Sequence, residues 1–241
     1  MAVSIDTVYQ KVLAIANKEQ RGYVTPQEFN LFANHAQMNI FDQYFYDQSQ
    51  FLRVPGNNTS YADPVTNLEE KISIFERYDK AFTAVNEYGD INLGTILNDL
   101  YRIGMVRIDY DSEPRFSLAE KISFKEQQAY ETSPLVNKSK IRPYYTSFKQ
   151  RIKVYPYPIP PKDRVLVSYV VKPKKVVWGY NIIGEHALYD ATISQEFQLH
   201  PSEENNLIVK ILALAGISLS DPGLYQIASA EDQKNIQQEK Q

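Results

Sequence analysis

The sequence predicts an α+β fold: a helical bundle built from N- and C-terminal helices, with a β-rich central hairpin region. Three observations favour this class. Apolar residues recur at steps of three and four between Ile5 and Ala16, and again between Leu207 and Ala215, as on amphipathic helices. Between these ends, residues 147–171 are rich in β-branched side chains, which are typical of strands.

One domain over residues 1–241 is expected. The chain is long enough to bury a core without covalent staples, and it shows no internal repeat or low-complexity linker. Within it we expect an N-terminal helical part (1–90), a mixed, β-rich centre (91–200) and C-terminal helices (201–241).

The first two helices are separated by a strongly punctuated joint, RGYVTPQEFN. Ser4 is a suitable N-cap for the first helix, and Gly22 suits its C-terminal turn. Thr25 is a suitable N-cap for the second helix, Pro26 stands at its first position, and Glu28 completes a capping box. This helix is predicted to run to about Leu52 with an apolar stripe of Phe29, Phe32, Ala36, Ile40, Phe41, Tyr44 and Phe45.

The centre has a mixed pattern. Residues 68–82 fit either a helix or a strand, residues 95–110 end in a half-buried strand, and residues 117–129 are predicted to be helical. The runs 147–157 and 164–171, joined by a proline-rich turn, predict a hairpin. The basic run 172–175 is expected to form a solvated turn.

The C-terminal part returns to helix. Ser202 is the expected N-cap of a helix over 203–214 that Gly216 ends. A second helix start lies at residues 220–222 and leads into a polar tail. We expect the segment 221–241 to dock on a partner as a helix in a groove.

Composition excludes several classes of chemistry. The absence of cysteine removes disulfides, thiolate nucleophiles and Cys-based zinc sites. A net charge of -3 argues against sequence-specific nucleic-acid binding, and no signal peptide or membrane span is expected. Eighteen Tyr and eleven Phe supply side chains that suit both cores and subunit interfaces.

No catalytic, cofactor or metal site is predicted. Phosphate-binding glycine motifs and a nucleophile elbow are missing from the sequence. His35 is expected to be solvated or at an interface, and His186 with Asp190 lacks an obvious third metal ligand. The acids Asp109, Asp111, Glu113 and Glu120 have the spacing of a calcium loop, but Pro114 stands where that loop needs glycine, so an acidic turn is the preferred interpretation.

Two stretches resemble tailed-bacteriophage structural proteins. TVYQKVLAIANKEQRGYVTPQEFNLFANHAQMNIFDQYF is similar to the opening of virion proteins of podovirus-like phages, including crAss-like and marine phages. HPSEENNLIVKILALAGISLSDPGLYQIASAEDQKNI resembles the closing helices of phage neck and tail adaptors. Together they cover roughly a third of the chain.

The resemblance implies a head-to-tail adaptor: a virion subunit, made in the host cytoplasm, that forms a homo-oligomeric ring, commonly twelvefold. Its partners would be the portal protein and other neck or tail proteins, with packaged DNA passing through the channel without sequence-specific binding. The alternatives are another virion component (tail-tube, nozzle or capsid accessory protein), a cytoplasmic protein-binding module, or an enzyme. Neither a cofactor nor a membrane is implied. The residues expected at interfaces are Thr25, Pro26, Glu28, Tyr155, Tyr157, Tyr169, Leu224, Tyr225 and Ile227.

Overall fold

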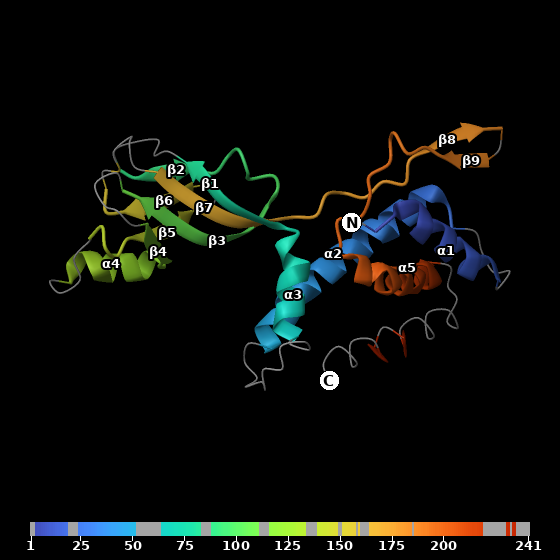
Figure 1. Ribbon diagram of the computed structural model, residues 1–241, viewed down its shortest axis with the longest axis horizontal. Helices are drawn as coiled ribbons and strands as arrows, with labels where there is room; N and C mark the ends of the chain where they lie inside the picture. Colours follow the sequence, from blue (N-terminus) through green and yellow to red (C-terminus); the bar gives the residue numbers. More distant parts are fainter. Residues whose placement is uncertain are drawn as a thin grey trace. The chain divides into compact units, whose positions relative to one another are not determined.

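The computed structural model (Figure 1) describes residues 3–18, 24–51, 64–82, 88–110, 116–133, 139–148, 151–157, 159, 164–184, 186–218, 230–231 and 233–234. The chain divides into two compact units. Unit 1 comprises Met1–Ile74 and Pro173–Gln241, and unit 2 comprises Phe75–Lys172. Among the described residues, no helix has the length and apolar character needed to cross a membrane.

Unit 1 is mainly helical. It contains α1 (Ile5–Lys18), α2 (Pro26–Phe51), α3 (Pro64–Ser73), the short 3₁₀ helix η1 (Pro201–Glu203) and α5 (Glu204–Ser218). Helix α5 contacts both α1 and α2. The apolar stripes predicted for the first and last helices are buried: Ile5, Val8, Tyr9, Val12 and Ala16 in α1, and Leu207, Ile208, Ile211, Leu212 and Ala215 in α5.

Helix α2 holds an extended segment, residues 173–179, through side-chain amides. The Asn30 amide bonds both backbone groups of Trp178, accepting from its N–H at 2.7 Å and donating to its carbonyl at 3.2 Å. One turn later, Asn34 accepts from Val176 N–H at 2.9 Å and donates to its carbonyl at 2.8 Å. We call this set, with Gln37 as its third rung, the amide ladder.

The third rung joins two segments. Gln37 donates to the Lys174 carbonyl at 2.8 Å and accepts from the Gln198 N–H at 3.1 Å. On the opposite edge of the extended segment, Val177 and Gln195 exchange two backbone hydrogen bonds. Lys174, Val176, Val177 and Trp178 therefore have partners for their backbone groups as residues of a strand would, although the partner on one side is a helix.

Unit 1 also contains a two-stranded antiparallel hairpin of β8 (Tyr180–Ile183) and β9 (His186–Tyr189). It follows the extended segment directly, and in Figure 1 it lies apart from α2 and α5.

Unit 2 is a curled, seven-stranded sheet with the strand order β1-β7-β3-β4-β5-β6-β2. Its strands are β1 (Glu76–Phe82), β2 (Asp90–Asn92), β3 (Leu100–Asp109), β4 (Ser117–Lys121), β5 (Tyr144–Phe148), β6 (Arg151–Tyr155) and β7 (Arg164–Val171). All neighbours are antiparallel except β4 and β5, which are parallel and are connected through α4 (Phe124–Thr132). A parallel pair needs such a crossover because a tight turn cannot join it.

This sheet carries a core of its own. Alternate residues of the central strands are fully buried, including Val106 and Ile108 of β3 and Val165 and Val167 of β7. A smaller cluster of Ile122, Tyr144 and Tyr155 packs with Tyr130 of α4. Unit 2 therefore buries apolar surface independently of the helices of unit 1.

The predicted fold class was wrong. The centre of the chain is not a hairpin attached to a helical bundle; it is a seven-stranded curled sheet, so sheet dominates the architecture. The predicted hairpin is also incorrect, because β6 pairs with β5 and β2 while β7 pairs with β1 and β3. Pro156 follows β6 directly, and its missing N–H prevents the ladder from continuing into a tight turn.

Three boundaries also differ from the prediction. Residues 117–129 are split between β4 and α4, because Ser123 and Glu126 form a capping box that starts the helix at Phe124. His200, not Ser202, caps the C-terminal helical segment, and its ring accepts from the Ser202 N–H. Gly216 lies inside α5 and does not end it. Apart from these boundaries, the basic run 172–175 is extended and does not form the predicted turn.

Several elements are confirmed. The second helix begins at Pro26 as predicted and ends at Phe51, one residue before the expected end. The residues of its predicted apolar stripe are buried or half-buried. The ambiguous segment 68–82 contains both a helix end and a strand, and the half-buried strand ending near Tyr110 is β3. Gly22 lies outside the described residues.

The amide ladder should dominate the stability of unit 1. Replacing Asn34 with Ala leaves both backbone groups of the buried Val176 unpaired, so we expect the free energy of unfolding to fall by about 3 kcal/mol. Urea titration followed by the fluorescence of the single tryptophan, Trp178, measures this. The control is Asn205→Ala at an exposed site of α5, with an expected change within about 0.5 kcal/mol. Equal effects would contradict the role given to the ladder.

Candidate assembly interface

The base of the β8–β9 hairpin is rigidly attached to unit 1. Trp178 is buried between Tyr9 of α1, with ring centroids 4.2 Å apart, and Tyr180 and Tyr189 of the hairpin, at 5.7 and 5.8 Å. Its indole N–H donates to Asp6 at 3.0 Å. Because Trp178 is also the first rung of the amide ladder, the hairpin is positioned by α1 and α2 together.

Polar contacts close the base. Gly179 exchanges bonds with the returning chain: its N–H donates to the Ser194 hydroxyl and its carbonyl accepts from Asp190 N–H, both at 2.9 Å. A side chain at Gly179 would collide with Ile193, whose backbone lies 2.9 Å from the position of a Cβ. The Thr192 hydroxyl and N–H, followed by the Asn181 amide, lower the pKa of Asp190 by hydrogen bonding to its carboxylate.

The tip of the hairpin is apolar on both faces. Ile182 lies on the face of Tyr180 and Tyr189, whereas Ile183 and Leu188 lie on the opposite face. Their exposed fractions are 72%, 65% and 51%. Large aliphatic side chains exposed on both sides of a two-stranded sheet are costly in water, and such a sheet is marginally stable alone. This tip, defined by Ile182, Ile183 and Leu188, is the best candidate for an interface in unit 1.

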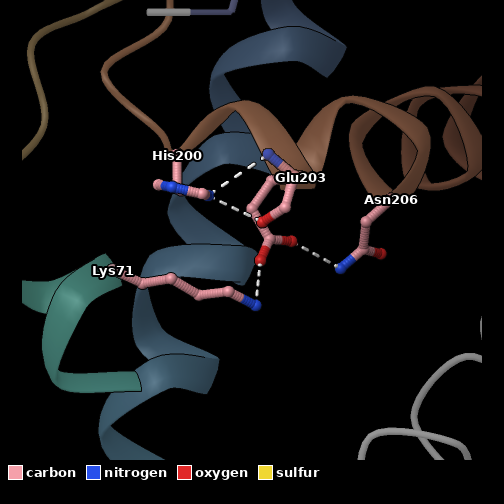
Figure 2. A network of polar contacts seen from close by, with 5 residues as sticks. Lys71, His200, Glu203 and Asn206 are labelled. Carbon is pink, nitrogen blue, oxygen red and sulfur yellow. Dashed lines mark hydrogen bonds and ion pairs between the residues drawn. The ribbon is translucent and has the colours of Figure 1, made fainter. Parts of the chain in front are cut away.

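A largely buried ion pair joins Lys71 and Glu203 in unit 1 (Figure 2). Lys71 of α3 lies 2.7 Å from Glu203 of η1, and Asn206 donates to the second Glu203 oxygen at 3.0 Å. The Glu203 side chain is only 3% exposed, and that of Lys71 19%. His200 turns instead toward Ser202, 2.8 Å from its hydroxyl. Since both carboxylate oxygens are engaged, the pair ties α3 to η1 and α5.

The residues predicted for interfaces are not brought together into one described surface. Thr25, Pro26 and Glu28 form the start of α2, where Thr25 N–H donates to Glu28 at 3.0 Å and Glu28 N–H donates to the Thr25 hydroxyl at 3.3 Å. The capping box is therefore confirmed as a helix start. Tyr155 and Tyr169 are buried within unit 2, and Tyr157 is exposed. Leu224, Tyr225 and Ile227 lie outside the described residues.

The candidate metal ligands are likewise scattered. No group of three or more metal-binding side chains occurs among the residues that the structure describes. Asp109 ends β3 and Glu120 lies in β4, while Asp111 and Glu113 fall in the undescribed stretch 111–115. His35 is exposed on α2, and His186 belongs to a strand, not to a helix that would place Asp190 one turn away.

Sequence reasoning missed the β8–β9 tip. A signal was present, because Gly184, which adopts a positive φ of 67°, separates two short apolar runs. Glycine in this conformation between such runs is typical of a hairpin turn. The amide ladder also had a signal: Asn30, Asn34 and Gln37 follow helical spacing beside an apolar stripe.

The Thr25–Glu28 box makes a pH-dependent contribution. Hydrogen bonds from the Thr25 backbone and hydroxyl lower the pKa of Glu28 below its ordinary 4.5, so the stabilisation is present above 4.5 and is lost as the pH falls through the lowered value. We expect wild type to exceed Glu28→Gln in thermal midpoint at pH 6 and to lose that advantage in acid. Glu69→Gln, at an exposed site of α3, is the control. A difference independent of pH would contradict this account.

The Lys71–Glu203 pair should behave as a buried pair. Lys71→Met leaves the Glu203 charge without its partner, and we expect a loss of about 3 kcal/mol of unfolding free energy, much of it recovered in Lys71→Met with Glu203→Gln. Lys11→Met removes the exposed pair with Glu204 and should cost at most about 1 kcal/mol. Chemical denaturation of the wild type, the two single variants Lys71→Met and Glu203→Gln, and the double variant measures the coupling. Additive losses in the double variant would show that the two side chains act independently.

Comparison with known proteins adds no assignment. No protein-family model matches the sequence, and no curated protein matches it significantly.

Proposed function

We propose that this chain is a structural subunit of a tailed-phage virion, a head-to-tail adaptor or neck ring protein that docks on the portal and links it to the tail around the DNA channel. The observation that carries an assembly role is the apolar tip of β8–β9, held on a fixed base. The phage context comes from the resemblance of the two terminal stretches. The proposed partners are further copies of the chain, the portal and other neck or tail proteins.

The hairpin fits an assembly role because its base is held by unit 1 while its tip is exposed and apolar. The base is fixed by Trp178, which makes ring contacts with both α1 and the hairpin, and by hydrogen bonds to α2. The tip exposes Ile182, Ile183 and Leu188. A partner that covers these side chains gains the free energy of removing apolar surface from water, and a fixed base reduces the entropy lost on binding.

The charge of the chain agrees with a position beside DNA that it does not bind tightly. A formal net charge of -3 supplies no strong overall attraction for phosphate. A channel wall made of subunits with this charge would let packaged DNA slide past.

Virions produced from the genome that encodes this chain provide the direct test. We expect mass spectrometry of purified particles to find the chain in a fixed ratio to the portal, and gold-labelled antibody to mark the head–tail junction. Labelling along the tail or over the capsid would indicate a different virion component. Absence of the chain from particles, with presence in the infected lysate, would overturn the proposal.

The tip should be needed for incorporation and not for folding. Ile183→Asp with Leu188→Asp places charges on exposed side chains, so we expect the thermal midpoint to be nearly unchanged while incorporation into particles falls at least tenfold. Leu31→Asp, at an exposed site of α2, is the matched control and should be incorporated normally. Normal incorporation of the tip variant would remove the observation on which the assembly role rests.

A further inference from the structure

The β8–β9 hairpin is a two-stranded sheet with two open edges. At its base, the Gly179 carbonyl accepts from the Asp190 N–H at 2.9 Å. Because antiparallel pairs alternate between bonded and non-bonded, this pair fixes which backbone groups of the hairpin turn outward. They belong to Tyr180 and Ile182 on β8 and to Ala187 and Tyr189 on β9. No described residue of the same chain bonds these outward groups.

These edges lack the features that block pairing with another chain. Natural edge strands are protected by lysine, proline, bulges or very short length. The register of β8 with β9 is unbroken, and residues 180–189 contain no lysine, arginine or proline. In the unit 2 sheet, by contrast, the edge strand β1 is interrupted by a bulge between Arg77 and Lys80, and the edge strand β2 has three residues. Among the described strands, those of the hairpin are therefore the least protected against pairing.

A second copy of the chain supplies the matching edge. Hairpins that run along the axis of a ring all point the same way, so β9 of one copy runs antiparallel to β8 of the next. At equal height, the outward groups of Ala187 then face those of Ile182 in the next copy, and Tyr189 faces Tyr180. The first pair sets a small side chain beside a large one, and the second sets two aromatic rings side by side, which is a favourable cross-strand pair.

Charge does not oppose this contact. Residues 180–189 contain one acid, Glu185. Neighbouring hairpins in one sheet lie two strand spacings apart, about 10 Å. This distance exceeds the Debye length of about 8 Å at physiological ionic strength, so repulsion between equivalent acids is largely screened. The next acid, Asp190, already accepts hydrogen bonds from Thr192 and Asn181.

We propose that the β8–β9 hairpins of neighbouring copies pair edge to edge, β9 of one copy with β8 of the next, and form one closed sheet around the axis of the ring. This inference rests on the proposed function, since it requires a ring of copies. The contact is heterologous, and closure leaves no edge strand exposed. It gives Ile182, Ile183 and Leu188, which are exposed in a single copy, cross-strand neighbours on both sides. A sheet that is marginally stable with two strands thereby becomes part of a larger one.

Disulfide trapping tests the contact, because the chain contains no native cysteine. Full-length Ile182→Cys is oxidised alone and in mixtures with a larger, tagged protein that carries either Ala187→Cys or, for a register shifted by two residues, Tyr189→Cys. Paired strands bring such residues within reach of a disulfide. The cysteines are placed on separate proteins because Ile182 and Ala187 are already partners within one hairpin.

We expect one of these mixtures to give a covalent heterodimer at least tenfold more abundant than the homodimer of any single variant, both in solution and in particles assembled from the two proteins. The control mixture is Ile182→Cys with Ile141→Cys, whose second cysteine replaces an exposed residue of unit 2. It should give no more covalent dimer than the single variants.

The outcomes separate this contact from the proposed function. A dominant homodimer of Ile182→Cys would show β8 pairing with β8 across a two-fold axis and would overturn the head-to-tail contact. Equal trapping in test and control mixtures, or none in solution and in particles, overturns it as well. If the chain is then still found at the head–tail junction, the proposed function stands with a different interface. If trapping succeeds while the chain is absent from virions, the contact stands as self-assembly and the phage role fails.

Discussion

The pairing of three amide side chains on α2 with an extended backbone is the constraint on which unit 1 depends. Asn30, Asn34 and Gln37 each bond backbone groups that a helix face would otherwise leave unpaired. Burying such groups without partners is among the more costly defects in a fold. The ladder therefore permits a strand-like segment to lie against a helix, and that segment leads directly into the hairpin.

The bulges in unit 2 have a related effect. Regular antiparallel pairing of β7 with β1 and β3 would continue through Ser168 on both sides. Instead, β1 and β3 depart from the register at the same level of β7, and a pocket lined by charged side chains and by the exposed Tyr78 and Met105 opens there. In both units, a local departure from regular pairing creates the feature with functional potential. Such departures persist because other bonds satisfy the groups that they release.

Local signals were readable from the sequence, and distant pairing was not. Thr25 and Glu28 lie three residues apart, so their capping box depends on nothing beyond one turn of helix. By contrast, Val106 pairs with Val167 across the sheet, and alternating apolar residues are compatible with many partner strands. The hairpin error arose in this way: β6 and β7 are adjacent in sequence and separated in the sheet. The spacing of Asn30 and Asn34 indicated a polar stripe on the helix. No nearby residue indicated that this stripe would bond the backbone of residues 176–178.

Unit 2 is one continuous segment that interrupts the sequence of unit 1, and the two ends of this segment lie close together. The Phe75 carbonyl accepts a hydrogen bond from the Val171 N–H at 2.9 Å, so the chain enters and leaves the sheet at one point. A domain whose two ends lie close together can be inserted into another domain without moving apart the residues on either side of the insertion. The sheet therefore has the properties of an inserted domain. Recombination could replace residues 75–172 with another domain while α1, α2, α5 and the amide ladder keep their own contacts.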